Sequence, residues 1–148
     1  MSRVGFLNHW QLRRDLQKAQ WDARHIGNAF HFVVLGDILR ELGQFKKAEQ
    51  AYVQALQKEP QNQEALWGKA VADAKTRKYA SAKEALGVLL TLVSDYKSGD
   101  ASLLYGRVLF VLKDLAPAKG HFAKHLSQWN HSQGALYLCA YFIRRRQA

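Results

Sequence analysis

The stretch AFHFVVLGDILRELGQFKKAEQAYVQALQKEPQN, residues 29–62, decides how this chain of 148 residues folds. On both sides of Gly43, apolar residues recur every three to four positions, which is the spacing of an amphipathic α-helix. Pro60 marks the end of the second helical run. The spacing therefore predicts two helices, over 29–42 and 45–58, that form an antiparallel pair.

The same pattern recurs twice further along the chain. A shift of 34 residues, and then of a further 36, brings a bulky residue, an alanine and a second large residue back into register. Gly36 has its counterpart in Gly106, 70 residues on. Small residues at fixed places let helices approach closely, so we expect the aligned alanines at close helix contacts. The aligned sets are Phe45, Ala48 and Tyr52; Tyr79, Ala82 and Leu86; and Leu115, Ala118 and Phe122.

The periodicity predicts four more helices, over 63–76, 79–94, 100–113 and 116–129, with the turn 97–100 absorbing the two extra residues. Residues 6–24 form a further amphipathic segment, which we expect to cap the first pair. Each pair alone leaves an apolar face open, so stability requires that neighbouring pairs stack. The predicted fold class is all-α, an α-solenoid of antiparallel helix pairs with about eight helices.

Residues 29–62 resemble the tetratricopeptide repeat, and the resemblance extends over about 100 of the 148 residues. The second repeat departs from the family pattern at Ala70 and Ser94, and the third at His125 and Asn130. The chain is similar to uncharacterised bacterial repeat proteins, some of which place such an array behind a membrane anchor. The resemblance implies a right-handed superhelix with a cap (1–28), three repeats (29–62, 63–98 and 99–132) and a C-terminal helix (133–148). The residues that carry it are Phe32, Leu35, Gly36, Leu39, Gly43, Phe45, Ala48, Tyr52, Ala55 and Pro60.

In this family the first helix of each pair lines a concave groove that holds an extended or helical peptide. The resemblance therefore implies a protein-interaction scaffold, with Trp67 as an aromatic anchor for the ligand. The alternative is that Trp67 packs between helices. The implied groove residues are Phe30, Val33, Asp37, Arg40 and Glu41 from the first pair, Glu64, Trp67, Val71 and Lys75 from the second, and Asp100, Leu103, Arg107 and Phe110 from the third.

One sub-class of the family grips the C-terminal carboxylate of heat-shock chaperones with lysine, asparagine and basic side chains. The equivalent positions here are Val33, Asp37, Gly68, Asp100 and Leu104. None of them matches, and two are acidic. A peptide carboxylate would meet Asp37 and Asp100 without a paired cation, so a chaperone carboxylate clamp is not expected.

The formal charge of +10 raises a second interpretation, in which basic ends attach the chain to nucleic acid or to an anionic membrane surface. Residues 1–28 and 133–148 each carry +3, which is six of the ten surplus charges, and no dense basic stripe crosses the middle. Specific nucleic-acid binding needs a clustered footprint, so it is not favoured. A membrane-surface helix near the N-terminus would combine Arg3, Arg13, Arg14 and Lys18 with Trp10 and Trp21, although Asp15 and Asp22 dilute its charge.

Signatures of catalysis are missing from the sequence. It has no phosphate-binding glycine loop, no dinucleotide fingerprint and no cysteine pair with zinc spacing. His121 and His125 share one face of a predicted helix, but packed or solvated histidines explain them better than a metal site does. We therefore expect no enzyme, no metal and no cofactor. The single cysteine, Cys139, cannot close an intrachain disulfide, which agrees with a reducing, cytoplasmic compartment.

The C-terminal stretch LYLCAYFI, residues 136–143, is apolar on every side of a helix and precedes three arginines. It is too short to span a bilayer. A helix that ends a solenoid normally has a polar outer face. We therefore expect Leu138 and Phe142 to be covered by a second copy of the chain in a homodimer, by a partner protein, or by a continuation of the array.

Overall fold

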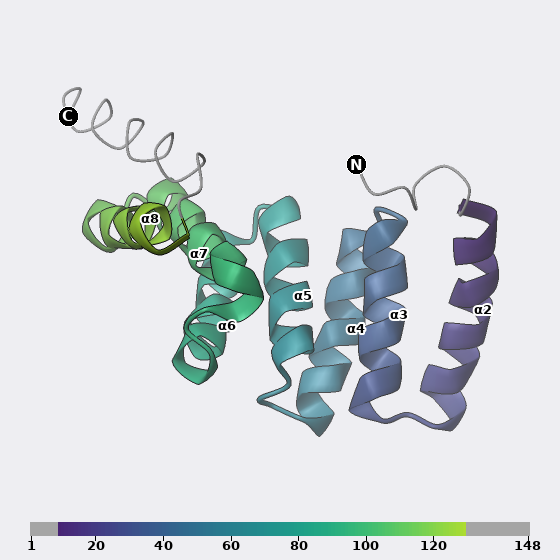
Figure 1. The fold of residues 1–148 in the computed structure, drawn as a ribbon. Helices are drawn as coiled ribbons and strands as arrows, with labels where there is room; N and C mark the ends of the chain where they lie inside the picture. Colours follow the sequence, from purple (N-terminus) through teal and green to yellow (C-terminus); the bar gives the residue numbers. More distant parts are fainter. Residues whose placement is uncertain (1–8, 130–148) are drawn as a thin grey trace. The chain divides into compact units, whose positions relative to one another are not determined.

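A computed structural model describes the backbone of residues 9–129, with side chains described as far as Lys124 (Figure 1). All regular structure in this range is helical. The chain divides into two compact units, residues 1–77 and 78–148. The first holds helices α2 (His9–His25), α3 (Ala29–Glu41), α4 (Phe45–Lys58) and α5 (Gln63–Lys75). The second holds α6 (Tyr79–Leu92), the 3₁₀ turn η1 (Tyr96–Gly99), α7 (Asp100–Val111) and α8 (Leu115–Trp129).

The helix boundaries follow from local chemistry and lie within two residues of the predicted ones for α3 to α8. Asparagine caps begin the first helix of two pairs: Asn28 accepts a hydrogen bond from the backbone N–H of His31 at 3.1 Å, and Asn62 accepts one from Ala65 at 3.0 Å. These caps satisfy N–H groups that have no partner within the helix.

The turn inside each helix pair has a residue with left-handed backbone conformation at the same position in all three repeats. Gly43, Arg77 and Lys113 have φ angles of 75°, 62° and 64°. They are separated by 34 and 36 residues, as the repeat register requires. The N–H of each bonds to the carbonyl oxygen three residues earlier, which closes the end of the preceding helix. The backbone therefore repeats even where the glycine of the first turn is replaced by a basic residue.

In the first unit the ring of Tyr52 lies between two glycines. The ring is fully buried, and a Cβ built on Gly36 would lie 2.7 Å from its Cε1 atom. A Cβ on Gly68, in α5, would lie 2.2 Å from its Cζ atom. Both distances are shorter than non-bonded carbon atoms tolerate, so α3 and α5 approach Tyr52 only because these positions lack side chains. The surrounding core comprises Ala29, Val33, Leu39, Ala48, Ala51, Ala55 and Ala65, and the inner face of α2 contributes Leu16 to it.

The second unit repeats this arrangement with a different ring. Phe122 on α8 is fully buried, and a Cβ on Gly106 of α7 would lie 2.7 Å from its Cε1 atom. Leu103, Leu109 and Ala118 complete the core cluster around this contact. The aligned alanines Ala48, Ala82 and Ala118 are all fully buried, as the repeat register predicts.

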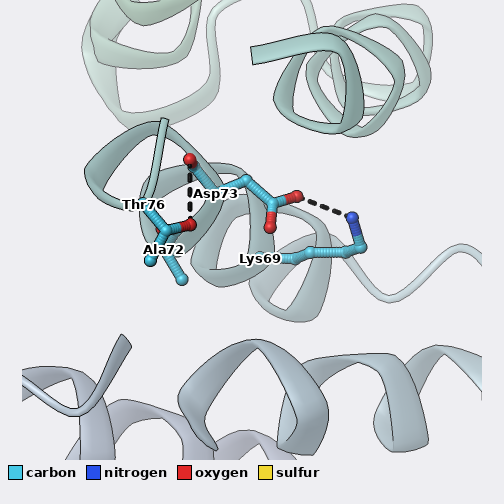
Figure 2. Close-up of polar contacts among 4 residues, drawn as sticks. All are labelled: Lys69, Ala72, Asp73 and Thr76. Atoms are coloured by element: carbon cyan, nitrogen blue, oxygen red, sulfur yellow. Dashed lines mark hydrogen bonds and ion pairs between the residues drawn. The ribbon is translucent and has the colours of Figure 1, made fainter. Parts of the chain in front are cut away.

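An ion pair along α5 was not foreseen from the sequence. The Nζ atom of Lys69 lies 2.7 Å from the Oδ2 atom of Asp73, with side-chain exposures of 16% and 0% (Figure 2). One turn later, the hydroxyl of Thr76 donates to the carbonyl oxygens of Ala72 and Asp73, at 3.0 and 3.2 Å. A buried carboxylate is tolerated only when it is paired with a positive charge. The ion pair with Lys69 therefore allows Asp73 to be buried in the second half of α5.

No helix among the described residues combines the length and apolar character needed to cross a membrane. The C-terminal residues predicted to self-associate, Leu138 and Phe142, lie outside the described residues, as does the start of the predicted N-terminal helix at Phe6.

The Tyr52 contact gives a direct test of the fold. Gly68→Ala should lower the free energy of unfolding by about 1–3 kcal/mol, because the added methyl group overlaps the ring. Gly120→Ala, in α8 where an added Cβ would meet nothing within 4 Å beyond the local helix backbone, should instead stabilise by about 0.5–1 kcal/mol through helix propensity. Chemical denaturation of the purified variants measures both.

A double variant separates the steric overlap with the Tyr52 ring from the effect of helix propensity. In a Tyr52→Leu background, Gly68→Ala should cost less than it does in the wild type, since the smaller side chain leaves room for the methyl group. Strict additivity of the two substitutions would contradict the packing described.

Candidate functional site

The candidate binding surface of the first unit lies on α3 and α5, which contact each other. Of the residues predicted to line the groove, Phe30 is 65% exposed, and Glu41, Glu64 and Lys75 are exposed. Arg40, Trp67 and Val71 are half-buried. The surface thus joins apolar side chains to charges of both signs. We call Phe30, Asp37, Arg40, Glu64, Trp67, Val71 and Lys75 the first-helix surface.

Two predicted groove residues do not belong to such a surface. Val33 is 3% exposed and Leu103 is 6% exposed, and each is part of the core of its own unit. Both residues have the same helical spacing as the exposed residues. An aliphatic side chain at the boundary between the apolar and polar faces of a helix is nevertheless buried when a neighbouring helix packs against it. We therefore reassign both from ligand contact to core packing.

The first-helix surface is connected to the core through Tyr52. Its hydroxyl donates a hydrogen bond of 2.6 Å to the Oδ1 atom of Asp37. The guanidinium of Arg40 lies 3.7 Å from the same oxygen, and the side chain of Asp37 is 47% exposed. Burial, followed by the hydrogen bond to Asp37, raises the pKa of Tyr52 well above its ordinary value. Asp37 is thus an acceptor for a buried phenol as well as a charge on the surface.

The sequence contains a signal for the Tyr52–Asp37 contact that helical periodicity does not carry. A tyrosine in a position that must be fully buried needs a partner for its hydroxyl. The candidates are polar residues next to the small residue that faces its ring, and Asp37 directly follows Gly36.

In the second unit, the predicted groove residues on α7 divide between solvent and core. Asp100 and Arg107 are exposed, whereas Phe110 is half-buried. The ring centroid of Phe110 lies 6.4 Å from that of Phe122, at an interplanar angle of 59°. Phe110 therefore contributes to packing as well as to the surface.

The second unit contains a serine–histidine contact. The Oγ atom of Ser102 lies 3.0 Å from Nδ1 of His121, and the ring of Tyr105 packs against the imidazole edge to face at 4.8 Å. Burial, and then the nearby charge of Lys124, lower the pKa of His121. Ser102 is only 2% exposed, so a substrate cannot reach its hydroxyl. The geometry is that of a satisfied interior polar pair.

The paired histidines gain no third ligand in the described part of the chain. His121 turns Nδ1 towards Ser102, and the side chain of His125 lies outside the described residues. Within the range that the structure describes, no three histidine, cysteine, aspartate or glutamate side chains cluster as metal ligands would.

Comparison with known proteins relates this architecture to a repeat family. A family profile described as Tetratricopeptide repeat matches residues 39–95. No curated protein sequence gives a significant match.

Among solved structures, MamA residues 41 to the end, from Desulfovibrio magneticus RS-1, superposes with a TM-score of 0.86 at 18% identity, covering 95% of this chain and 79% of that one. A double mutant of MamA RS-1 gives the same TM-score and identity, with coverage of 94% and 78%. The first repeat domain of Spaghetti (RPAP3), bound to the HSP90 peptide SRMEEVD, gives 0.73 at 20% identity, with coverage of 80% and 93%. At these identities the likeness establishes the fold.

The Tyr52–Asp37 hydrogen bond can be tested by removing one atom. Tyr52→Phe keeps the ring between the glycines and should lower the free energy of unfolding by about 1–2 kcal/mol. Because the pKa of Tyr52 is raised on folding, the stability it contributes is present below its unfolded value of 10.0 and is lost as pH rises above that value. Tyr79→Phe, at the position where the first pair has Phe45, is the matched control and should change stability little.

The lowered pKa of His121 predicts that the stability of the protein depends on pH. Since the folded pKa of His121 is depressed, its stabilising contribution is complete above the unfolded value of 6.5 and is lost as pH falls through the folded pKa. Wild-type protein should lose more thermal stability between about pH 7.5 and about pH 5.5 than His121→Asn. The same substitution at exposed His9 should leave the acid response unchanged; equal responses of all three proteins would show that His121 is not responsible.

Proposed function

We propose that the chain, of which residues 39–95 match the tetratricopeptide repeat, is a protein-interaction scaffold that holds an extended or helical segment of another protein against the first helices α3 and α5. The observation that carries the proposal is the first-helix surface. It offers the exposed ring of Phe30 and the half-buried Trp67 and Val71, with Arg40 and Glu64 among them. Aromatic side chains in such a setting contribute most of the affinity in peptide complexes.

Mixed charge suggests a ligand of mixed character. Asp37 and Glu64 on this surface are acidic, whereas Arg40 and Lys75 are basic. Neither sign dominates, so electrostatics would fix the register of a bound segment more than its affinity. We infer a ligand with apolar anchors and both charges.

A carboxylate terminus is not the ligand that this surface favours. RPAP3 is the neighbour whose structure holds a chaperone peptide, SRMEEVD. At the corresponding positions of the first unit, Val33 is buried, Asp37 accepts the Tyr52 hydroxyl, and Gly68 lies against the Tyr52 ring. None can donate a charge-assisted hydrogen bond to a carboxylate, and Asp37 would repel it.

Other parts of the proposal concern assembly and location. Repeat proteins of this class are in general scaffolds without catalysis, and the contact of buried Ser102 with half-buried His121 gives no reason to assign an activity here. Self-association through Leu138 and Phe142 and a cytoplasmic location also belong to the proposal. Both agree with the apolar C-terminal stretch and the single cysteine, respectively.

The proposal predicts that ligand binding depends on two aromatic side chains. Trp67→Ala and Phe30→Ala should each weaken binding of captured partners or of array peptides by about tenfold or more. Phe30→Ala is the more decisive variant, because a side chain that is 65% exposed is not needed for folding. Val88→Ala, at an exposed apolar residue of α6, is the control and should leave binding intact.

Affinity purification followed by fluorescence titration of the identified segments measures these effects. Ligands that are uniformly acidic and indifferent to both aromatic substitutions would overturn the proposal. That outcome would favour a basic adaptor that acts through its charged ends.

A further inference from the structure

Helix α2 has two faces of different composition. The inner face packs on α3 through Leu16, with Ala19 and Ala23 buried at 4% and 5% exposure. The opposite side carries two tryptophans and three arginines. We call Trp10, Arg13, Arg14, Gln17, Trp21 and Arg24 the tryptophan–arginine face.

The two tryptophans of this face are open to solvent and held in place. Trp10 is 68% exposed and Trp21 is 56% exposed. They are eleven residues apart, about three helical turns or roughly 16 Å, and so lie on the same side of α2. The guanidinium carbon of Arg14 lies 5.5 Å from the ring centroid of Trp10. The imidazole of His25 stacks on Trp21 at 4.2 Å and contacts its backbone oxygen through Nδ1 at 2.8 Å.

The charge of the face is of one sign. Arg13, Arg14 and Arg24 are all exposed. By the helical period, the two acidic residues of α2 lie outside the tryptophan–arginine face. Asp15 lies to one side of it, and the Oδ2 atom of Asp22 lies 3.9 Å from the Nζ atom of Lys18. A helix that caps a solenoid needs only a polar outer face, so paired tryptophans are not explained by folding.

We propose that the tryptophan–arginine face docks α2 on the surface of an anionic lipid bilayer, lying parallel to it. Indole rings prefer the headgroup level of a membrane, where their apolar body and polar N–H are both accommodated. Arginines beside them can reach lipid phosphates while their stems stay against the rings. The interaction is peripheral and adds to any protein ligand that the first-helix surface holds.

Other occupants fit the face less well. A second copy placed symmetrically would set three arginines against three arginines. Nucleic-acid bases would need open ring faces for stacking, but Arg14 and His25 already cover one face of each tryptophan. A protein anchor needs a deep pocket, whereas Trp10, Arg13, Arg14 and Gln17 line only a shallow, open depression. A broad, flat, anionic surface suits a convex helix.

Vesicle co-sedimentation of the full chain tests the proposal. Vesicles of phosphatidylglycerol mixed with phosphatidylcholine should bind the wild type, and phosphatidylcholine alone should not. Each basic residue near an anionic surface contributes about fivefold, so Arg13→Gln with Arg14→Gln should weaken partitioning by about tenfold or more. Lys46→Gln with Lys47→Gln, which removes the same charge from exposed positions of α4, should change it less than about twofold.

Fluorescence reports whether the rings themselves enter the interface. Brominated lipids should quench the wild type, and quenching should be lost with Trp10→Phe plus Trp21→Phe, a pair at exposed positions that keeps the fold. Equal weakening by the lysine and arginine pairs, or unchanged quenching in the tryptophan variant, would overturn the proposal. Preferential binding of an oligonucleotide over vesicles by the wild type would overturn it in favour of nucleic acid.

Discussion

The first unit depends on one steric constraint, the placement of the Tyr52 ring against Gly36 and Gly68. Three helices meet at this ring, because Tyr52 comes from α4 and the glycines come from α3 and α5. Neither glycine can gain a methyl group without displacing the ring, and the ring cannot shrink without leaving a cavity. The same sixteen-residue interval separates Gly106 from Phe122 in the second unit, where the glycine again faces a buried ring. In each unit the absence of a side chain on the glycine is thus matched to the size of the ring.

Much of this fold could be predicted from the sequence, because the repeat is a local pattern with a fixed period. The helices α3 to α8 and the burial of Ala48, Ala82 and Ala118 follow from spacing alone. The role of Gly68 could not be predicted, since it contacts a ring from the preceding repeat and has no glycine at its own register position in the others. The Lys69–Asp73 pair was missed for a related reason: spacing shows that the two can meet, but not that they are buried.

In the candidate site, too, some features could be predicted from the sequence and others could not. Phe30 and Glu64, two of the residues that the resemblance implies for the groove, are exposed in the structure. Val33 and Leu103 are buried instead, because the width of the buried stripe of a helix depends on which neighbouring helices cover it. Asp37 illustrates the remaining difficulty, in that one carboxylate both accepts the Tyr52 hydroxyl and faces solvent beside Arg40. Its structural partner is fifteen residues away, beyond the reach of helical periodicity.

The left-handed turn residues have a consequence for the order of events in folding. Gly43 adopts this conformation at no steric cost, whereas Arg77 and Lys113 adopt it only against their intrinsic preference. Lys97 and Ser98 add two further left-handed residues before α7. The first helix pair is therefore the one whose connection is encoded locally, and Asn28 caps the start of its first helix. Folding of a quasi-one-dimensional array can begin at any repeat and spread to its neighbours, so we expect it to begin at the first pair, whose turn adds no backbone strain.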